Sequence, residues 1–114
     1  MRPTALVVAF AIFSLACSDN TQSVSTLCGS SGSATISATD GQVFSPASAT
    51  ITHGQSVCWQ NSGTIPHTVT SNDGTSFNSA LGVGQIFVHP FPTAGSFPYR
   101  CTIHAGMTGT ITVN

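Results

Sequence analysis

The chain has 114 residues, which is enough for one domain at most, and only 4% of them are charged. Two residues are Lys or Arg and three are Asp or Glu, so the formal net charge is −1 with histidine neutral. This composition offers no basic patch for nucleic acid and no acidic cluster to steer a cationic partner, so partner recognition must rely mainly on apolar contact.

The N-terminus has the pattern of an export signal, predicted over residues 1–16. Arg2 is the lone basic residue of a short first region, and residues 5–15 form an almost uninterrupted apolar run. This run is too short to span a bilayer, and a buried core helix is a weak alternative because nothing else in the chain looks helical. The pattern predicts an exported protein in the periplasm or on the outer cell surface.

The signal ends in residues 13–18, FSLACS, which resemble a bacterial lipobox. In a lipobox, cleavage precedes a cysteine that becomes diacylated, so the expected lipid on Cys17 would anchor the protein to a membrane. Ser14 stands where an aliphatic residue is normal, and ordinary cleavage nearby would instead leave Cys17 as a spare thiol. Residues 17–27 are rich in polar residues without periodicity and are predicted to form a tether.

Residues 28–114 are predicted to form one all-β domain, because short β-type runs alternate with Gly, Pro, Asn and Asp. The predicted strands cover residues 33–39, 49–53, 56–60, 67–71, 85–89, 95–100 and 108–113. Strands without helices predict a sandwich or barrel. Alternation places Phe97, Tyr99 and Cys101 on a common, inward side, so the Cys101 thiolate is expected at the buried end of a strand.

A short C-terminal motif carries the clearest chemical signal in the chain. Cys101, His104 and Met107 follow the spacing C-x2-H-x2-M, directly after a predicted strand. Upstream, His67 follows a proline. One thiolate, two imidazoles and one thioether are the ligands of a trigonal Cys/His2 copper centre with a weak axial Met, which proteins use to move single electrons. A seven-residue loop can wrap one ion while a distant strand delivers His67.

Each of these residues also has an ordinary explanation. A lone Cys is most often a small buried hydrophobe, a lone Met fills the core, and a His at a strand end is usually a hydrogen-bonded surface residue. All four together at this spacing are hard to obtain from packing needs alone, which favours copper. His53 and His89 lack a ligand partner at useful spacing and are expected to be ordinary surface residues.

The remaining cysteines predict a disulfide. If Cys17 carries lipid and Cys101 binds metal, Cys28 and Cys58 remain, and an oxidising compartment lets them pair. Closing a loop of roughly 30 residues would stabilise a small domain by about 3 kcal/mol. The alternative is a pair of buried thiols.

From about Thr35 to Val113 the chain resembles the cupredoxins, small single-domain blue-copper proteins of the plastocyanin, amicyanin and pseudoazurin kind. The copper-loop motif is highly specific, and supporting markers lie at residues 43–46, 54–61, 66–69 and 95–99. The resemblance implies an all-β Greek-key β-sandwich with about seven to eight strands and one type 1 copper ion.

The resemblance also assigns roles to residues. It implies that His67, Cys101 and His104 bind copper in plane. Met107 would be the long axial ligand. The backbone N–H of Thr68 would donate a hydrogen bond to the Cys101 sulfur. The two-residue gap between His104 and Met107 matches the amicyanin spacing, whereas plastocyanins and pseudoazurins have a longer one.

The residue before the ligand cysteine departs from plastocyanins. Plastocyanins have an exposed Tyr there, with an acidic patch around it, whereas this chain has Arg100 and lacks the acidic residues. A second docking site remote from copper is therefore not expected. Redox proteins are expected to dock at an apolar rim around His104, which is formed by Ile65, Pro66, Ile103, Ala105 and Gly106.

The predicted function is electron transfer by an exported carrier, expected to be a monomer, that cycles copper between Cu(II) and Cu(I). The alternative is a periplasmic copper chaperone or store, but such proteins tend to use Met- and His-rich sites, and this chain has only two Met. A copper enzyme needs a second copper site and a substrate pocket, and four His are too few for that. The chain is not expected to be an enzyme.

Overall fold

The computed structural model describes Cys28 and residues 33–114. The predicted export signal, the tether and Cys17 lie outside the described residues. Within this described part, every regular element is a β-strand, and no helix is long and apolar enough to cross a membrane.

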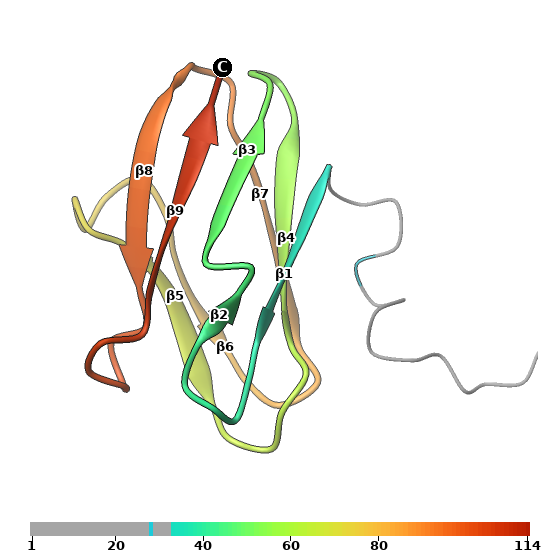
Figure 1. Ribbon diagram of the computed structural model, residues 1–114, viewed down its shortest axis with the longest axis vertical. Helices are drawn as coiled ribbons and strands as arrows, with labels where there is room; N and C mark the ends of the chain where they lie inside the picture. The colour runs from blue at the N-terminus through green and yellow to red at the C-terminus, as the bar shows by residue number, and fades with distance from the viewer. Residues whose placement is uncertain (1–27, 29–32) are drawn as a thin grey trace, which may run out of the picture.

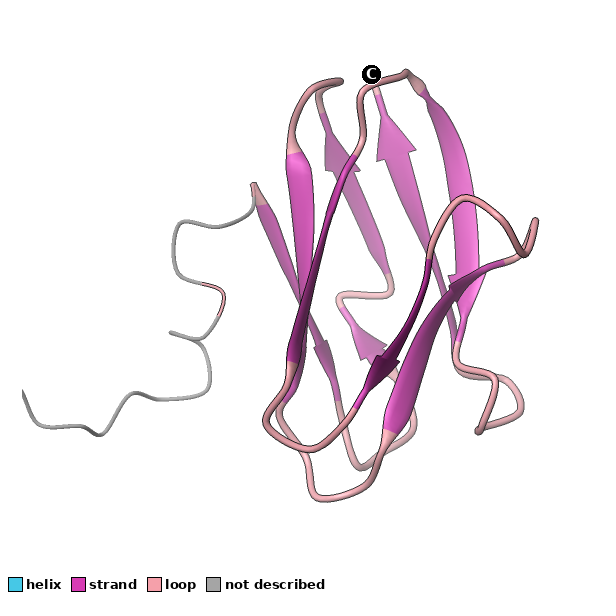
Figure 2. Cartoon of the chain, turned by 180° about the vertical axis from the view of Figure 1, so that it is seen from behind, coloured by secondary structure: helices cyan, strands magenta, loops and turns pink. Residues whose placement is uncertain are grey.

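Two sheets pack face to face, as Figure 1 shows, and Figure 2 shows the same two layers from behind. The strands of residues 33–114 are β1 (Ala34–Ala38), β2 (Phe44–Ser45), β3 (Ser48–Ile51), β4 (Ser56–Asn61), β5 (His67–Ser71), β6 (Asn78–Leu81), β7 (Ile86–Pro90), β8 (Gly95–Arg100) and β9 (Thr108–Val113). The strand order is β2-β1-β4-β7 in one sheet and β3-β9-β8-β5-β6 in the other. The parallel pairs β1–β4 and β3–β9 require crossovers, which fits a Greek-key sandwich.

The predicted all-β sandwich is confirmed, and all seven predicted strands are present with ends within two residues of the prediction. Two further strands, β2 and β6, were missed, so the described chain has nine strands rather than seven or eight. β2 is only two residues long, and β6 has the polar sequence Asn-Ser-Ala-Leu. Neither has the length or composition that marks a strand in sequence.

Trp59 on β4 organises the core between the sheets. It is fully buried, and its ring lies 5.4–6.5 Å, centroid to centroid, from the rings of Phe77, Phe87, Phe91 and Tyr99. Aromatic pairs in such stacked, tilted or edge-on arrangements contribute about 0.5–1.5 kcal/mol each beyond their buried area. This cluster joins both sheets and so fixes the end of β8, which Cys101 directly follows.

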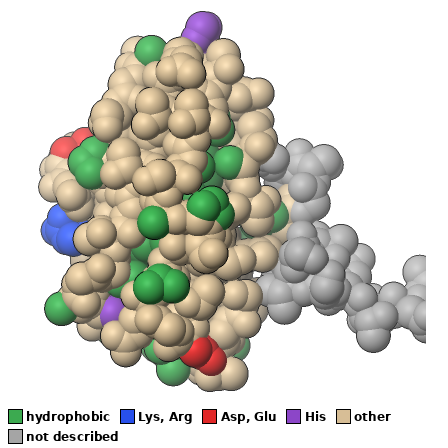
Figure 3. Space-filling view, in the orientation of Figure 1, with side chains coloured by type: hydrophobic (Ala, Val, Ile, Leu, Met, Phe, Trp, Pro, Cys, Tyr) green, Lys and Arg blue, Asp and Glu red, His purple; other side chains and the backbone are tan. Residues whose placement is uncertain are grey.

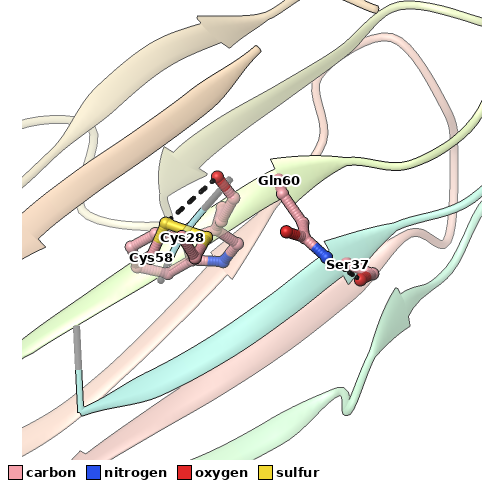
Figure 4. Close-up of a disulfide and its surroundings, with 5 residues drawn as sticks. Cys28, Ser37, Cys58 and Gln60 are labelled. Atoms are coloured by element: carbon pink, nitrogen blue, oxygen red, sulfur yellow. Dashed lines mark hydrogen bonds between the residues drawn. A yellow bond between two sulfur atoms is a disulfide. The ribbon is translucent and has the colours of Figure 1, made fainter. Parts of the chain in front are cut away.

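The predicted disulfide between Cys28 and Cys58 is present, with the two Cα atoms 5.8 Å apart (Figure 4). The alternative of two buried thiols is therefore wrong. Cys58 lies on the outer face of β4, opposite to the face that carries Trp59. Beside it, the Gln60 side-chain amide donates a hydrogen bond to the Ser37 hydroxyl at 3.0 Å, which links β4 to β1.

Four connections meet at one end of the sandwich, which we call the loop end: residues 39–43, 62–66, 82–85 and 101–107. The end of β1 pairs with the end of β4, the end of β4 with the start of β7, and the start of β5 with the end of β6. β8 ends beside β5 and continues towards the same end. Figure 1 shows these connections in the lower part of the view. All four predicted ligand residues lie at this end.

Candidate metal centre

Two strands and one loop bring three predicted ligands together. His67 is the first residue of β5, Cys101 directly follows β8, and His104 lies in the loop that leads to β9. One donor atom from each residue, an imidazole nitrogen or the sulfur, lies within 4.8 Å of the other two. Cys101 Sγ is 3.5 Å from His104 Nδ1, and the two imidazole rings have centroids 4.9 Å apart. The spacing seen in sequence therefore becomes a compact three-donor site.

The site is buried on one side and open on the other. His67, Cys101 and Met107 are exposed to only 1%, 3% and 1%, respectively, whereas His104 is half-buried. His104 is thus the predicted ligand that faces solvent. The loop from Arg100 to Thr108 lines an open depression of about 510 Å³ beside it.

His67 has the properties of a metal ligand. Neither of its ring nitrogens has a hydrogen-bond partner among the described residues, although both are buried. Leaving buried polar atoms without partners is costly, and a metal ion would satisfy one of them. Burial, followed by the neighbouring charge of His104, lowers the pKa of His67. The imidazole is therefore kept in the neutral form that binds metals.

Backbone hydrogen bonds close the loop that carries the other ligands. The N–H of Cys101 donates to the carbonyl of Met107 at 2.9 Å, and the N–H of Met107 donates to the carbonyl of His104 at 3.3 Å. Gly106 has a positive φ of 80°, which an L side chain rarely adopts, so the tight turn favours glycine. This closure turns the Met107 side chain into the interior.

Thr68 holds the Cys101 sulfur in two ways. Its backbone N–H donates to Cys101 Sγ at 3.4 Å, which confirms the hydrogen bond implied by the resemblance. Its hydroxyl accepts a hydrogen bond from the backbone N–H of Thr102 at 2.8 Å, a contact that sequence reasoning missed. The residue after the thiolate is therefore tied to the same strand as the thiolate itself.

Asn61 shapes the approach to His67 and was also missed as a site residue. Its side-chain amide is 1% exposed and donates to the carbonyls of Ile65 and Leu81 at 2.8 and 3.0 Å. Its oxygen accepts from the N–H of Gly63 at 3.0 Å. These contacts fix the position of the β4–β5 loop relative to the end of β6.

The other two histidines lie outside the cluster. His53 is exposed, as expected, with its Nδ1 3.0 Å from the carbonyl oxygen of Asn114. His89 is not an ordinary surface residue: it is half-buried between sheets, with ring centroids 5.1 and 5.0 Å from Phe77 and Phe91. Burial lowers the pKa of His89. Its position on the inward face of β7, which also carries Phe87, explains this.

The donor set fits copper. A soft thiolate and two imidazoles lie within reach of one ion, and a buried thioether side chain follows in the same loop. Zinc sites with closed tetrahedral geometry use thiolates and imidazoles too, but the predicted weak thioether ligand is typical of copper.

Comparisons with known proteins agree with this chemistry. Residues 31–114 match the family model described as copper binding proteins, plastocyanin/azurin family. A plastocyanin from Scenedesmus fuscus is 36% identical over 84 residues, covering 62% of this chain and 86% of that protein. The structure of a novel purple cupredoxin from Nitrosopumilus maritimus is similar, with 31% identity and a TM-score of 0.65, over 71% of this chain and 99% of that chain.

A copper-containing nitrite reductase from Thermus scotoductus shares 26% identity and gives a TM-score of 0.64, but the match covers 71% of this chain and only 22% of that chain. The family match, in contrast, covers the whole described sandwich and the donor cluster at its loop end. The predicted resemblance to cupredoxins is thus confirmed, and copper is the cofactor. The chain belongs to the plastocyanin/azurin family of copper-binding proteins.

Proposed function

We propose that His67, Cys101 and His104 would hold one type 1 copper ion, that Met107 would supply its weak thioether ligand, and that the protein carries single electrons between redox proteins. The observation that carries this proposal is the preassembled donor set, with three donor atoms within 4.8 Å of one another. Donors that are already in place can bind both oxidation states with little rearrangement, which favours rapid electron transfer.

The protein positions the donor atoms and shields them from water. When bound, copper supplies one-electron exchange between Cu(II) and Cu(I). The buried His67 and Cys101 keep their donor atoms away from bulk water, and the hydrogen bond from Thr68 holds the sulfur. The half-buried His104 gives the site one edge that is open to an approaching partner.

The surface around His104 supports docking by apolar contact. Val43, Val83 and Ile103 are 51%, 56% and 53% exposed, and they belong to three different connections of the loop end. We call these three residues and the predicted rim residues together the apolar end surface. Figure 3 shows that charged side chains are few on the side of the molecule in view. A redox partner with an apolar patch suits this surface.

We further propose that the protein is exported and monomeric, and that a lipid on Cys17 anchors it to a membrane. The disulfide between Cys28 and Cys58 supports an oxidising compartment, because such bonds are rare in the cytosol. The proposed role is that of a carrier and not of an enzyme, which the match to the plastocyanin/azurin family and the similarity to a plastocyanin support.

Redox cycling in the presence of a Cu(I) chelator tests the proposed role. The copper-loaded protein would be reduced and reoxidised repeatedly while its visible spectrum is recorded. A carrier should regain the same Cu(II) spectrum in every cycle and keep one copper ion per chain. Loss of copper to the chelator in each reduced phase would contradict the proposal and support a copper store.

A further inference from the structure

Asp40 lies in the turn between β1 and β2 and reaches the loop that leads to His67. Its Oδ1 accepts a hydrogen bond from the backbone N–H of Thr64 at 2.6 Å, and its Oδ2 accepts one from the Thr64 hydroxyl at 2.9 Å. Thr64 is 24 residues away in sequence, three residues before His67. Hydrogen bonds to an ionised carboxylate are about twice as strong as neutral ones. The carboxylate therefore ties together two connections of the loop end.

The β4–β5 loop is shaped to receive this carboxylate. A Cβ atom at Gly63 would overlap the Asp40 carboxyl group, so a glycine is needed for this close approach. From the other side, Asn61 binds the carbonyl of Ile65 and the N–H of Gly63. The loop is thus held from within by Asn61 and from the neighbouring turn by Asp40.

This loop helps to set the position of the His67 ring. No side chain among the described residues forms a hydrogen bond with either ring nitrogen, so none orients the ring towards Cys101 and His104 in that way. Packing and the neighbouring backbone must therefore position the ring, and the backbone that enters β5 is held by the Asp40–Thr64 hydrogen bonds. Contacts that fix residues 62–66 thus help to place one donor atom of the metal centre.

Asp40 also places a negative charge at the loop end. The chain has three acidic residues, and Asp73, the other one that the structure describes, follows the opposite end of β5 and is bound there by Ser71. The hydrogen bonds from Thr64 to Asp40 place the Asp40 charge beside the loop that leads to His67. A negative charge near the centre favours Cu(II), the more positive copper state, over Cu(I).

We infer that Asp40 is a positioning residue of the copper centre, an inference that rests on the proposed copper site. Through Thr64 it fixes the backbone that presents His67 to the metal, and its charge lowers the reduction potential. It is exposed and touches no ligand, so it acts only through the loop and through its field.

Cu(II) affinity, measured by competition with a chelator, tests the positioning role. Asp40→Ala should weaken binding by up to about tenfold, which is the lower end of the effect of removing a group hydrogen-bonded directly to a metal ligand. Thr64→Val, which removes the hydroxyl contact, should weaken it less. Asp73→Ala is the matched control, since it removes an exposed turn carboxylate at the other end of β5, and it should leave Cu(II) affinity unchanged.

A measurement on the metal-free protein gives a readout independent of copper. Amide hydrogen exchange at Thr64 should be slow in the wild type, faster in Asp40→Ala, and unchanged in Asp73→Ala. Asp40→Asn separates the effect of the hydrogen bond from the effect of the charge, because the amide oxygen can still accept a hydrogen bond from the Thr64 N–H. It should keep near-normal affinity but raise the reduction potential, with a shift that shrinks as salt is added.

The inference is overturned if Asp40→Ala binds Cu(II) as tightly as the wild type, or if Asp73→Ala weakens binding equally. An unchanged potential in Asp40→Asn would overturn the role of the charge. A wild-type protein that forms no thiolate–copper band would instead overturn the proposed function, so the two failures are distinguishable.

Discussion

The backbone N–H of Thr68 lies 3.4 Å from the sulfur of Cys101, so the strand that carries one predicted ligand, His67, also donates a hydrogen bond to another. The Thr68 hydroxyl reinforces this contact by accepting the N–H of Thr102 at 2.8 Å. The distance between β5 and the thiolate is therefore set by one residue. A hydrogen bond to a ligand sulfur tunes the metal's reduction potential.

Thr68→Val should lower the reduction potential. Valine keeps the shape of threonine but leaves the Thr102 N–H without its acceptor, so the N–H bond to the sulfur should lengthen and withdraw less charge from it. We also expect a loss of about 1 kcal/mol in the free energy of unfolding. Voltammetry and urea unfolding measure the two effects. Ser37→Ala is the control, because it removes a hydroxyl acceptor in the other sheet, and it should lower the free energy of unfolding without changing the reduction potential. Equal reduction potentials in Thr68→Val and the wild type would contradict the role of this hydroxyl.

Ile103→Lys should slow electron self-exchange between two copies of the protein. If copies meet through the apolar end surface, a lysine on each brings like charges together and should reduce the rate by about tenfold at low ionic strength. The visible spectrum should not change. Val88→Lys, at an exposed apolar position on the outer face of β7, is the control. Self-exchange rates are measured by NMR line broadening. Equal rates in the two variants would exclude the apolar end surface as the site of electron transfer.

The Cys28→Ser/Cys58→Ser double variant should lose about 3 kcal/mol in the free energy of unfolding, because a cross-link over 30 residues restricts the unfolded chain. Urea unfolding of the metal-free protein under oxidising conditions measures this loss. The thiolate–copper band should be unaffected, since Cys58 lies on the outer face of the four-stranded sheet. Unchanged stability would show that the bond contributes nothing to folding.

The turn after β5 should make stability depend on acid pH. Hydrogen bonds from Ser71, then from Ser76 and Thr75, hold the pKa of Asp73 well below its usual range. The ionised carboxylate therefore stabilises the fold above the unfolded-state pKa of about 3.9, and this contribution is lost as pH falls through the lower folded-state value. Unfolding free energies of Asp73→Asn should fall less steeply than those of the wild type between about pH 5 and pH 3. Parallel curves would contradict this.

Features encoded by local patterns were predictable from sequence. The long strands show alternation, and the C-x2-H-x2-M spacing places three predicted ligands within one loop whatever the rest of the fold. Counting cysteines was enough to predict the pair Cys28 and Cys58. Each of these signals depends only on residues that are close in sequence or on the composition of the chain.

Features that depend on distant contacts could not be predicted. The hydrogen bonds between Asp40 and Thr64 join residues 24 apart, and both residue types are common in exposed turns. His89 sits in an alternating strand, but only the pairing of β7 with β4 places it against the aromatic core. β6 pairs with β5 through its backbone, so its polar sequence gave no signal.

The most direct test of the copper assignment is the visible absorption spectrum of the Cu(II)-loaded protein beside that of Cys101→Ser. The wild type should bind one copper ion per chain and show an intense thiolate-to-copper charge-transfer band. Cys101→Ser should lose this band while keeping its β-sheet circular dichroism, because a hydroxyl cannot replace the soft thiolate donor. An intense band that persists in Cys101→Ser, or one that never forms in the wild type, would contradict a copper centre built on Cys101.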